Sequence, residues 1–315
     1  MKLLVFQGSP RPDGFTQLVL DRFLQGVADE GASWELIRLA ERDVRPCVGC
    51  YSCWYDSPGV CVQRGDDMAG ILERMRSCDV EVYATPLYAC GMTAIMKRVV
   101  ERTLPRLLPF LVAGKEGLTN HPFRPPVQAA RAMVLISVCG FPEVEHFSAL
   151  VEHFRALARA SERALAGVLL RPGSEAMLFL DQLGKAGPEI LEGFRQAGRE
   201  LVERGRVSTE TEELVRRPWT RNLQAFREQA NAFWHVRMEH AEAVRRGEEA
   251  RSFRDAARDD MRILLAGLAA RFDPAAAAGL RATIQFDVRG QQPGQWYHEI
   301  RDGTCSFRAG TAENQ

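Results

Sequence analysis

The first half of this 315-residue chain alternates short apolar runs with segments of helical periodicity. Five runs are expected to form strands: residues 3–6, 34–39, 80–84, 132–138 and 165–170. The segments between them repeat apolar residues three and four positions apart, which is typical of a helix with one buried face. This alternation predicts an α/β fold, a doubly wound parallel sheet with helices on both faces. Residues 188–246 are mostly helical, and we expect them to extend a first domain over residues 1–246.

The pattern changes towards the C-terminal end. Residues 283–288 alternate apolar and polar side chains, and residues 296–300 and 304–308 are typical of two further strands. Asp302-Gly303 marks a tight turn between them. Together these features predict an antiparallel meander. Three short strands make a thin domain, so we expect residues 247–315 to form a small, incomplete α+β domain.

The charges balance, with 41 lysines and arginines against 41 aspartates and glutamates. A net charge of zero argues against a large nucleic-acid footprint and against a polybasic membrane anchor. The chain contains no uninterrupted apolar span of about twenty residues. We therefore expect a soluble, cytoplasmic protein that binds no nucleic acid and does not insert into a membrane. In the cytoplasm its cysteines would be thiols or metal ligands.

Four of the eight cysteines lie within fifteen residues, in the pattern C-x2-C-x2-C-x7-C. They are Cys47, Cys50, Cys53 and Cys61. In one interpretation their thiolates hold a [4Fe–4S] cluster, which needs four cysteine ligands. In a second they bind zinc as a tetrahedral site, and in a third they are thiols without a metal. The residues themselves leave these three interpretations open.

Ligands of open parallel sheets bind outside the carboxyl ends of the strands. Three predicted strand ends carry unusual residues: 8–16, 85–91 and 137–141. The first has neither Gly-Lys-Ser/Thr nor Gly-x-Gly-x-x-Gly, so it is not a nucleoside-triphosphate or dinucleotide loop of those types. It offers the hydroxyls of Ser9 and Thr16, the charge of Arg11 and the free amides of a helix N-terminus. This combination suits a single phosphate monoester.

These strand ends resemble the NAD(P)H-dependent FMN reductase group of flavodoxin-like proteins. The motifs are Gly8-Ser9-Pro10-Arg11 with Gly14-x-Thr16, Thr85-Pro86-Leu87-Tyr88, and Gly91-Met92 before a helix. The cysteine segment with Asp66-Asp67-Met68 after it resembles the iron–sulfur flavoprotein branch. The resemblance covers roughly residues 1–240 and implies FMN, NAD(P)H as co-substrate, and a homodimer. It implies FMN contacts at Ser9, Arg11, Phe15, Thr16, Gln17, Pro86, Leu87, Tyr88, Gly91, Cys139 and Gly140.

Some residues depart from this resemblance or lie outside it. Phe15 stands where an asparagine is common, which removes one polar contact to the phosphate. The flavin supplies the hydride and electron chemistry, so no catalytic side chain is required, and we expect none at His121 or His146. Residues 272–310 resemble the start of a sterol-carrier-protein domain, a family that surrounds an apolar tunnel for lipids.

Three functions follow as hypotheses. The first is an FMN-dependent oxidoreductase that passes electrons from NAD(P)H to a flavin, quinone or other small acceptor. The second is an iron–sulfur flavoprotein that carries electrons to a protein partner. The third is a lipid-binding protein acting through the C-terminal module. The motifs at the strand ends favour the first two.

Overall fold

The computed structural model describes residues 1–114, 117–125, 130–177, 186–220, 222–249, 252–253, 256–257, 260–290 and 292–312. The chain divides into two compact units, Met1–Trp219 and Thr220–Gln315. This boundary lies before helix α8 (Leu223–Arg245), whereas the sequence pattern placed it after residue 246. Among the helices described, none has the length and apolar character needed to cross a membrane.

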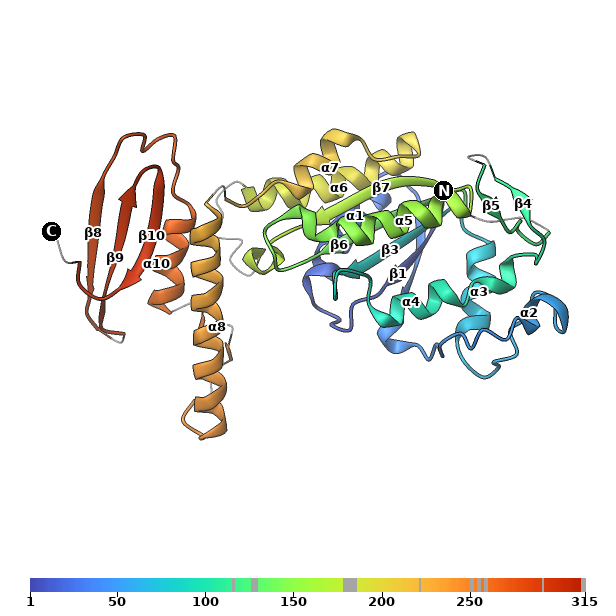
Figure 1. The fold of residues 1–315 in the computed structure, drawn as a ribbon, viewed down its shortest axis with the longest axis horizontal. Helices are drawn as coiled ribbons and strands as arrows, with labels where there is room; N and C mark the ends of the chain where they lie inside the picture. Colours follow the sequence, from blue (N-terminus) through green and yellow to red (C-terminus); the bar gives the residue numbers. More distant parts are fainter. Residues whose placement is uncertain are drawn as a thin grey trace. The chain divides into compact units, whose positions relative to one another are not determined.

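A five-stranded parallel sheet forms the centre of the first unit (Figure 1). Its strands are β1 (Lys2–Gln7), β2 (Ser33–Arg38), β3 (Val80–Pro86), β6 (Ala132–Val138) and β7 (Ala164–Arg171). Their spatial order is β2-β1-β3-β6-β7, which is the order of flavodoxin-like folds. β3 and β6 are buried along their whole length, as expected for strands inside a sheet that is covered on both faces. The predicted fold class is confirmed.

Helices close both faces of this sheet. Alternate side chains of β1 point to opposite sides, so Leu3 and Val5 join one apolar core while Leu4 and Phe6 join the other. The first core includes residues of α1 (Phe15–Asp29), α6 (Ala186–Arg204) and α7 (Thr209–Arg216). The second includes residues of α3 (Met68–Arg76), α4 (Ala94–Glu101) and α5 (Ser148–Ala160). The shorter elements are η1 (Leu39–Glu41), α2 (Ser52–Tyr55), η2 (Leu104–Arg106), η3 (Val144–Phe147), β4 (Val112–Ala113) and β5 (Thr119–Asn120).

Two glycines let α1 and α6 cross closely. A Cβ atom at Gly198 would lie 2.1 Å from the carbonyl oxygen of Phe23, and one at Gly26 would lie 1.8 Å from that of Arg195. Backbone atoms cannot move aside as the end of a flexible side chain can, so these positions require the smallest residue. The crossing fixes α1, whose first turn begins the candidate site.

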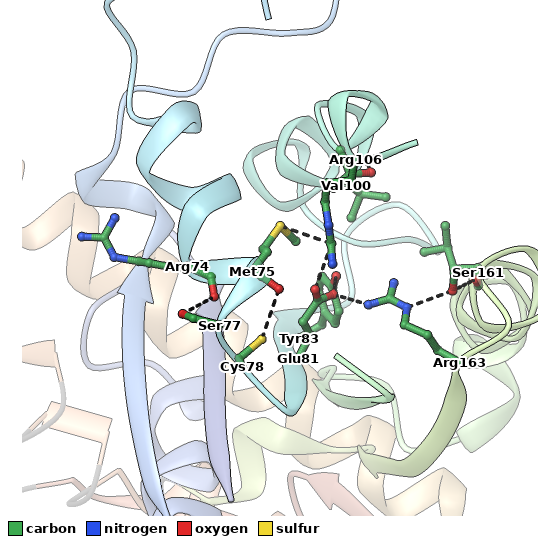
Figure 2. Close-up of polar contacts among 12 residues, drawn as sticks. Arg74, Met75, Ser77, Cys78, Glu81, Tyr83, Val100, Arg106, Ser161 and Arg163 are labelled. Carbon is green, nitrogen blue, oxygen red and sulfur yellow. Dashed lines mark hydrogen bonds and ion pairs between the residues drawn. The ribbon is translucent and has the colours of Figure 1, made fainter. Parts of the chain in front are cut away.

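The carboxylate of Glu81 in β3 is buried between two arginines (Figure 2). Arg106 and Arg163 each donate a hydrogen bond to it, at 2.9 and 2.5 Å, and the hydroxyl of Tyr83 donates a third at 2.6 Å. Burial raises the pKa of Glu81, but the charges of the two arginines outweigh this effect and hold the pKa below its usual range. Through Arg106, strand β3 anchors the segment that follows α4.

The helix cap of α7 (Thr209–Arg216) differs from the one that the local sequence pattern alone would indicate. Thr209 and Glu212 fit a capping-box pattern, but the N-cap residue is Ser208, whose hydroxyl accepts a hydrogen bond from the amide of Thr211 at 3.2 Å. Glu212 instead accepts a hydrogen bond from the amide of Val168 in β7, at 2.7 Å. The carboxylate that would complete the cap therefore satisfies a backbone amide of the sheet.

The described part of the second unit includes a three-stranded antiparallel sheet and the helices α8 and α10. Its elements are α8, α10 (Met261–Ala270), β8 (Ala282–Val288), β9 (Gly294–Arg301) and β10 (Thr304–Ala309). The strand order β10-β9-β8 is the meander expected from the sequence, and α10 lies against α8 (Figure 1). Asn222 donates to the carbonyl of Cys305 at 3.1 Å, and Glu228 accepts from the amide of Phe307 at 3.0 Å. These bonds to β10 explain why α8 belongs to this unit.

Candidate functional site

The loop after β1 is fastened to the two elements beside it. The amide of Gly8 donates to the carbonyl of Ala84 in β3 at 2.7 Å, and the hydroxyl of Thr93 donates to the carbonyl of Gly8 at 2.7 Å. A Cβ atom at Gly8 would lie 2.8 Å from Met96 Cε and 3.2 Å from Thr93 Oγ1. The loop therefore follows a fixed path against the N-terminus of α4.

The N-terminus of α1 faces this loop without a side-chain cap. Its N-cap residue is Gly14, and its first turn contains no acidic residue. The first amides of an α-helix have no partner within the helix, and they carry partial positive charge. Ser9 accepts a hydrogen bond from the amide of Arg11 at 3.1 Å, which tightens the loop and leaves the serine hydroxyl free to donate. This cradle suits an anion.

Three predicted phosphate contacts have side chains with different environments. Thr16 is buried in the first turn of α1. The ring of Phe15 packs against the apolar core, in agreement with its lack of a polar group. The side chain of Gln17 accepts from Arg38 at 2.7 Å and donates to Asp21 at 2.6 Å, so these two residues already hold it. The main-chain amide of Gln17 already donates to the carbonyl of Gly14 at 3.0 Å, so of Phe15 and Gln17 only the Phe15 amide is suited to an anion.

The loop after β3 holds the predicted flavin contacts Pro86, Leu87, Tyr88 and Gly91. The amide of Leu87 donates to the carbonyl of Val138 in β6 at 2.9 Å. Tyr88 and Gly91 exchange two hydrogen bonds of 2.9 Å, which closes a four-residue turn, and the Tyr88 ring is 44% exposed.

The two central residues of this turn are strained. Ala89 has a φ of 46° and Cys90 a φ of 62°, a left-handed conformation that favours glycine or asparagine. Such strain persists only where the surroundings impose it, and it is concentrated at functional sites. The turn ends at Gly91, immediately before the approach to α4.

The loop after β6 holds Cys139 and Gly140. Burial raises the pKa of Cys139 to about 11, so its thiol is neutral near pH 7, and it donates to the carbonyl of Phe141 at 3.4 Å. A Cβ atom at Gly140 would lie 2.6 Å from a carboxylate oxygen of Glu175. The amide of Ser174 donates to the carbonyl of Cys139 at 2.8 Å.

Ser174 and Glu175 were not predicted as site residues. They follow β7 and support the loop after β6, and only their position after a strand end could have indicated them.

Ser137 of β6 donates to the carbonyl of Thr85 at 2.7 Å, which joins the second and third loops. The structure thus brings the three predicted loops to one edge, at the point where the strand order turns from β1 to β3. An uncapped helix end beside apolar loop residues fits the phosphate and ring of FMN.

The cysteine segment forms a closed loop whose two ends are tied together. Asp43 and Asp67 exchange hydrogen bonds of 2.8 Å, one to the carboxylate of Asp67 and one to the carbonyl of Asp43. The side chain of Gln63 donates to the carbonyl of Pro46 at 2.8 Å. All four cysteines line one small pocket, which also contains Arg102.

The four thiols are not arranged around a single ion. In the part of the chain that the structure describes, no three histidine, cysteine or acidic side chains stand close enough together to hold one metal ion. A cubane cluster needs a wider arrangement, because each thiolate binds a different iron. Burial raises the pKa of Cys53, and the negative charges of Cys61, Cys50 and Cys47 add to this effect. Hydrogen bonds from Ser52 lower the pKa of the exposed Cys50. The pocket brings the four cysteines of the C-x2-C-x2-C-x7-C pattern to one place.

Both candidate histidines lie in aromatic contacts. His121 donates to the carbonyl of Phe110 at 3.2 Å and packs beside Trp54, with 4.8 Å between the ring centroids. Trp54 in turn donates to the carbonyl of Leu104 at 3.1 Å, which joins the cysteine loop to the segment after α4. His146 lies in η3, stacked on Phe141 with 4.4 Å between the centroids.

Known proteins resemble part of the chain. An iron–sulfur flavoprotein of Methanocaldococcus jannaschii is 33% identical over 117 residues, which are 37% of this chain and 59% of that protein. An iron–sulfur flavoprotein of Archaeoglobus fulgidus is 33% identical over 105 residues, 33% of this chain and 46% of that protein. The chain thus spans about three fifths of the first relative and less than half of the second.

Among solved structures, the NAD(P)H:quinone oxidoreductase of Methanothermobacter marburgensis is similar, with a TM-score of 0.47 and 18% identity. The matched region covers 64% of this chain and 96% of that protein. The loops after β1, β3 and β6 all begin within the segment matched by a family model. Residues 1–140 of this chain match the family described as NADPH-dependent FMN reductase.

Proposed function

We propose that this protein is an FMN-dependent oxidoreductase that takes electrons from NAD(P)H and passes them to a flavin, quinone or similar small acceptor. The observation that carries the proposal is the uncapped N-terminus of α1 beside the loop Gly8–Gly14, at the edge where the loops after β3 and β6 also meet. The family match over residues 1–140 supports it. A homodimer and a small-molecule or redox-protein acceptor are part of the proposal.

FMN bound here would supply hydride acceptance and one-electron transfer. The amides of Phe15 and Thr16, with Ser9 and Arg11, would hold its phosphate, and Gln17 would lie beside it. Pro86, Leu87, Tyr88 and Gly91 would lie along the ring system, with Cys139 and Gly140 close by. Because the Cys139 thiol is neutral near pH 7, it would not act there as a base.

Anaerobic purification followed by absorption spectroscopy tests this proposal. The protein should carry or take up one FMN, and NADPH or NADH should bleach the flavin bands. Ser9→Ala and Arg11→Gln should each weaken FMN binding by about tenfold, which corresponds to about 1.4 kcal/mol for one lost contact to a charged group. Arg22→Gln, a change at a half-buried position in the middle of α1 outside the proposed FMN contacts, is the matched control. A protein that neither contains nor takes up FMN would overturn the proposal.

The second candidate function is an iron–sulfur flavoprotein, in which Cys47, Cys50, Cys53 and Cys61 hold a [4Fe–4S] cluster as a second redox centre. The specific observation in its favour is the single pocket that all four thiols share with a buried arginine. Arg102 is 2% exposed, and its Nε has no hydrogen-bond partner among the described residues. A buried cation of this kind fits an anionic group in the pocket.

Iron and sulfide analysis separates the two candidates. Stoichiometric iron and sulfide, lost in Cys53→Ser while FMN is kept, would support the iron–sulfur flavoprotein. Cys78→Ser is the matched control, because Cys78 is also buried but lies outside the pocket. A yellow protein that contains no iron after anaerobic reconstitution would exclude the cluster, and the FMN-dependent oxidoreductase would then be the function that stands. Fast oxidation by a protein partner but not by quinones would favour the electron carrier.

A further inference from the structure

Arg102, which forms a buried ion pair with Asp66, is one of the residues that line the four-cysteine pocket. Arg102 is the C-cap residue of α4, and its guanidinium donates to the two carboxylate oxygens of Asp66 at 2.8 and 3.4 Å. Both side chains are about 1% exposed. A buried pair of this kind costs desolvation energy and is weak evidence for stability alone, so its position needs a further explanation.

The pair connects both ends of the cysteine loop. Arg102 also donates to the carbonyls of Arg45 at 2.8 Å and Gln63 at 3.4 Å, which lie two residues before Cys47 and two residues after Cys61. Asp66 accepts from the amide of Arg45, and from the amide of Met68 at the start of α3, each at 3.2 Å. One guanidinium and one carboxylate thus hold the segments that enter and leave the loop.

The guanidinium keeps one donor unused beside the thiols. Its Nε has no hydrogen-bond partner in the described part of the chain, although Arg102 lines the same pocket as the four cysteines. A guanidinium is charged at every working pH.

We propose that Arg102 is a positioning residue and the counter-cation of the four-cysteine pocket, and that it makes a cluster held there easier to reduce. The inference rests on the iron–sulfur part of the proposed function. Reduction by one electron adds one negative charge to the four-thiolate unit, and a fixed cation nearby stabilises the added charge. The carboxylate of Asp66 opposes this effect from the other side of the ion pair.

The two partners therefore predict opposite shifts. Arg102→Gln removes the cation, so the cluster's midpoint potential should fall. Asp66→Asn removes the anion and keeps an oxygen that can accept a backbone amide, so the potential should rise. Both changes break the same ion pair, and a purely structural role would shift both potentials in the same direction or leave both unchanged.

The experiment is an anaerobic spectroelectrochemical titration of the full-length protein with dithionite, after iron and sulfide analysis. Arg102→Lys should stay close to wild type because it keeps the charge. Arg45→Gln is the matched control, since it removes a cation next to the loop whose side chain is 52% exposed and screened by solvent. Its shift should be smaller than that of Arg102→Gln.

Each outcome has a defined meaning. Opposite shifts in the two variants support the inference, and equal, parallel or absent shifts in a loaded protein overturn it while the proposed cluster stands. A wild-type protein that binds no iron overturns the cluster and this inference together, but leaves the FMN proposal intact. If Arg102→Gln does not fold, the Asp66→Asn titration decides, because an unchanged or lower potential there contradicts the inference.

Discussion

The hydroxyl of Thr93 donates a hydrogen bond to the carbonyl oxygen of Gly8 at 2.7 Å, across 85 positions of sequence. The same hydroxyl accepts from the amide of Met96, and the amide of Thr93 donates to Thr85 Oγ1 at 3.2 Å. One threonine thus caps α4 and connects the loop after β1 with the end of β3. The loops after β1 and β3 carry most of the residues proposed to bind FMN.

Thr93→Val changes only one hydroxyl group to a methyl group, but we expect it to weaken FMN binding. The change leaves the buried Gly8 carbonyl without this donor and removes a helix cap, which together cost about 1–3 kcal/mol of stability. We expect FMN affinity to fall by about tenfold, because the phosphate loop loses its fixed path. Quenching of flavin fluorescence on titration measures this affinity.

Thr103→Val is the matched control for this change. Thr103 lies just after the same helix, and its hydroxyl donates only to the carbonyl of Val100 at 2.8 Å, within one turn. Its FMN affinity should match that of the unmodified protein. Equal losses in the two variants would mean that the link between Thr93 and Gly8 does not shape the site.

The α1–α6 crossing gives a second prediction. Gly198→Ala should destabilise the protein by more than about 3 kcal/mol, because its Cβ would meet a backbone carbonyl oxygen at 2.1 Å and the helices must separate. Gly193→Ala on the same helix would meet the side chains of Val215 and Leu214 at 3.0 and 3.1 Å, which can shift. It should cost less than about 1 kcal/mol, since alanine favours the helix. Urea unfolding of both variants makes the comparison, and similar midpoints would contradict it.

The sequence was a good guide to the parallel sheet. Residues 132–138 were expected as a strand and form β6 with the same bounds, because a strand buried on both faces must be a continuous apolar run. Residues 80–84, also expected as a strand, lie within β3. Local patterns of this kind depend on residues close together in the chain.

Contacts between distant segments were not predictable in this way. Nothing near Arg102 in the sequence indicates that it reaches both ends of the cysteine loop, and nothing near Glu175 indicates that it packs against Gly140. The turn at Ala89-Cys90 carries no turn signal, since neither residue favours a positive φ. These features result from tertiary packing that overrides local preference.

The cap of α7 gives a third prediction, at a position where the sequence pattern was misleading. Ser208→Ala should cost about 1 kcal/mol, because the amide of Thr211 loses its partner. Thr209→Val should change stability by less than about 0.5 kcal/mol, because Thr209 lies inside the helix and does not cap it. Thermal unfolding followed by circular dichroism distinguishes the two variants. A larger loss of stability in Thr209→Val than in Ser208→Ala would mean that Thr209, and not Ser208, caps the helix.

The buried carboxylate of Glu81 gives a fourth prediction, which concerns pH. Its pKa is lower in the folded protein than in the unfolded chain, so the stability that it contributes is fully present above the unfolded pKa of about 4.3. That stability is lost as the pH falls through the folded pKa. The free energy of unfolding should therefore decrease as the pH is lowered from 5 to 3, as measured by urea titration at each pH.

Glu81→Gln should remove this part of the pH dependence and cost about 3–5 kcal/mol at pH 7, because Arg106 and Arg163 then remain buried without their carboxylate. Glu101→Gln is the matched control, since its pair with Lys97 is exposed and contributes less than about 1 kcal/mol. If Glu81→Gln does not fold, Arg163→Gln can be used, because it leaves the pair of Glu81 with Arg106. In that variant the decrease in the free energy of unfolding between pH 5 and pH 3 should be smaller but still present. An acid transition of unchanged size in Glu81→Gln would assign the pH dependence to other carboxylates.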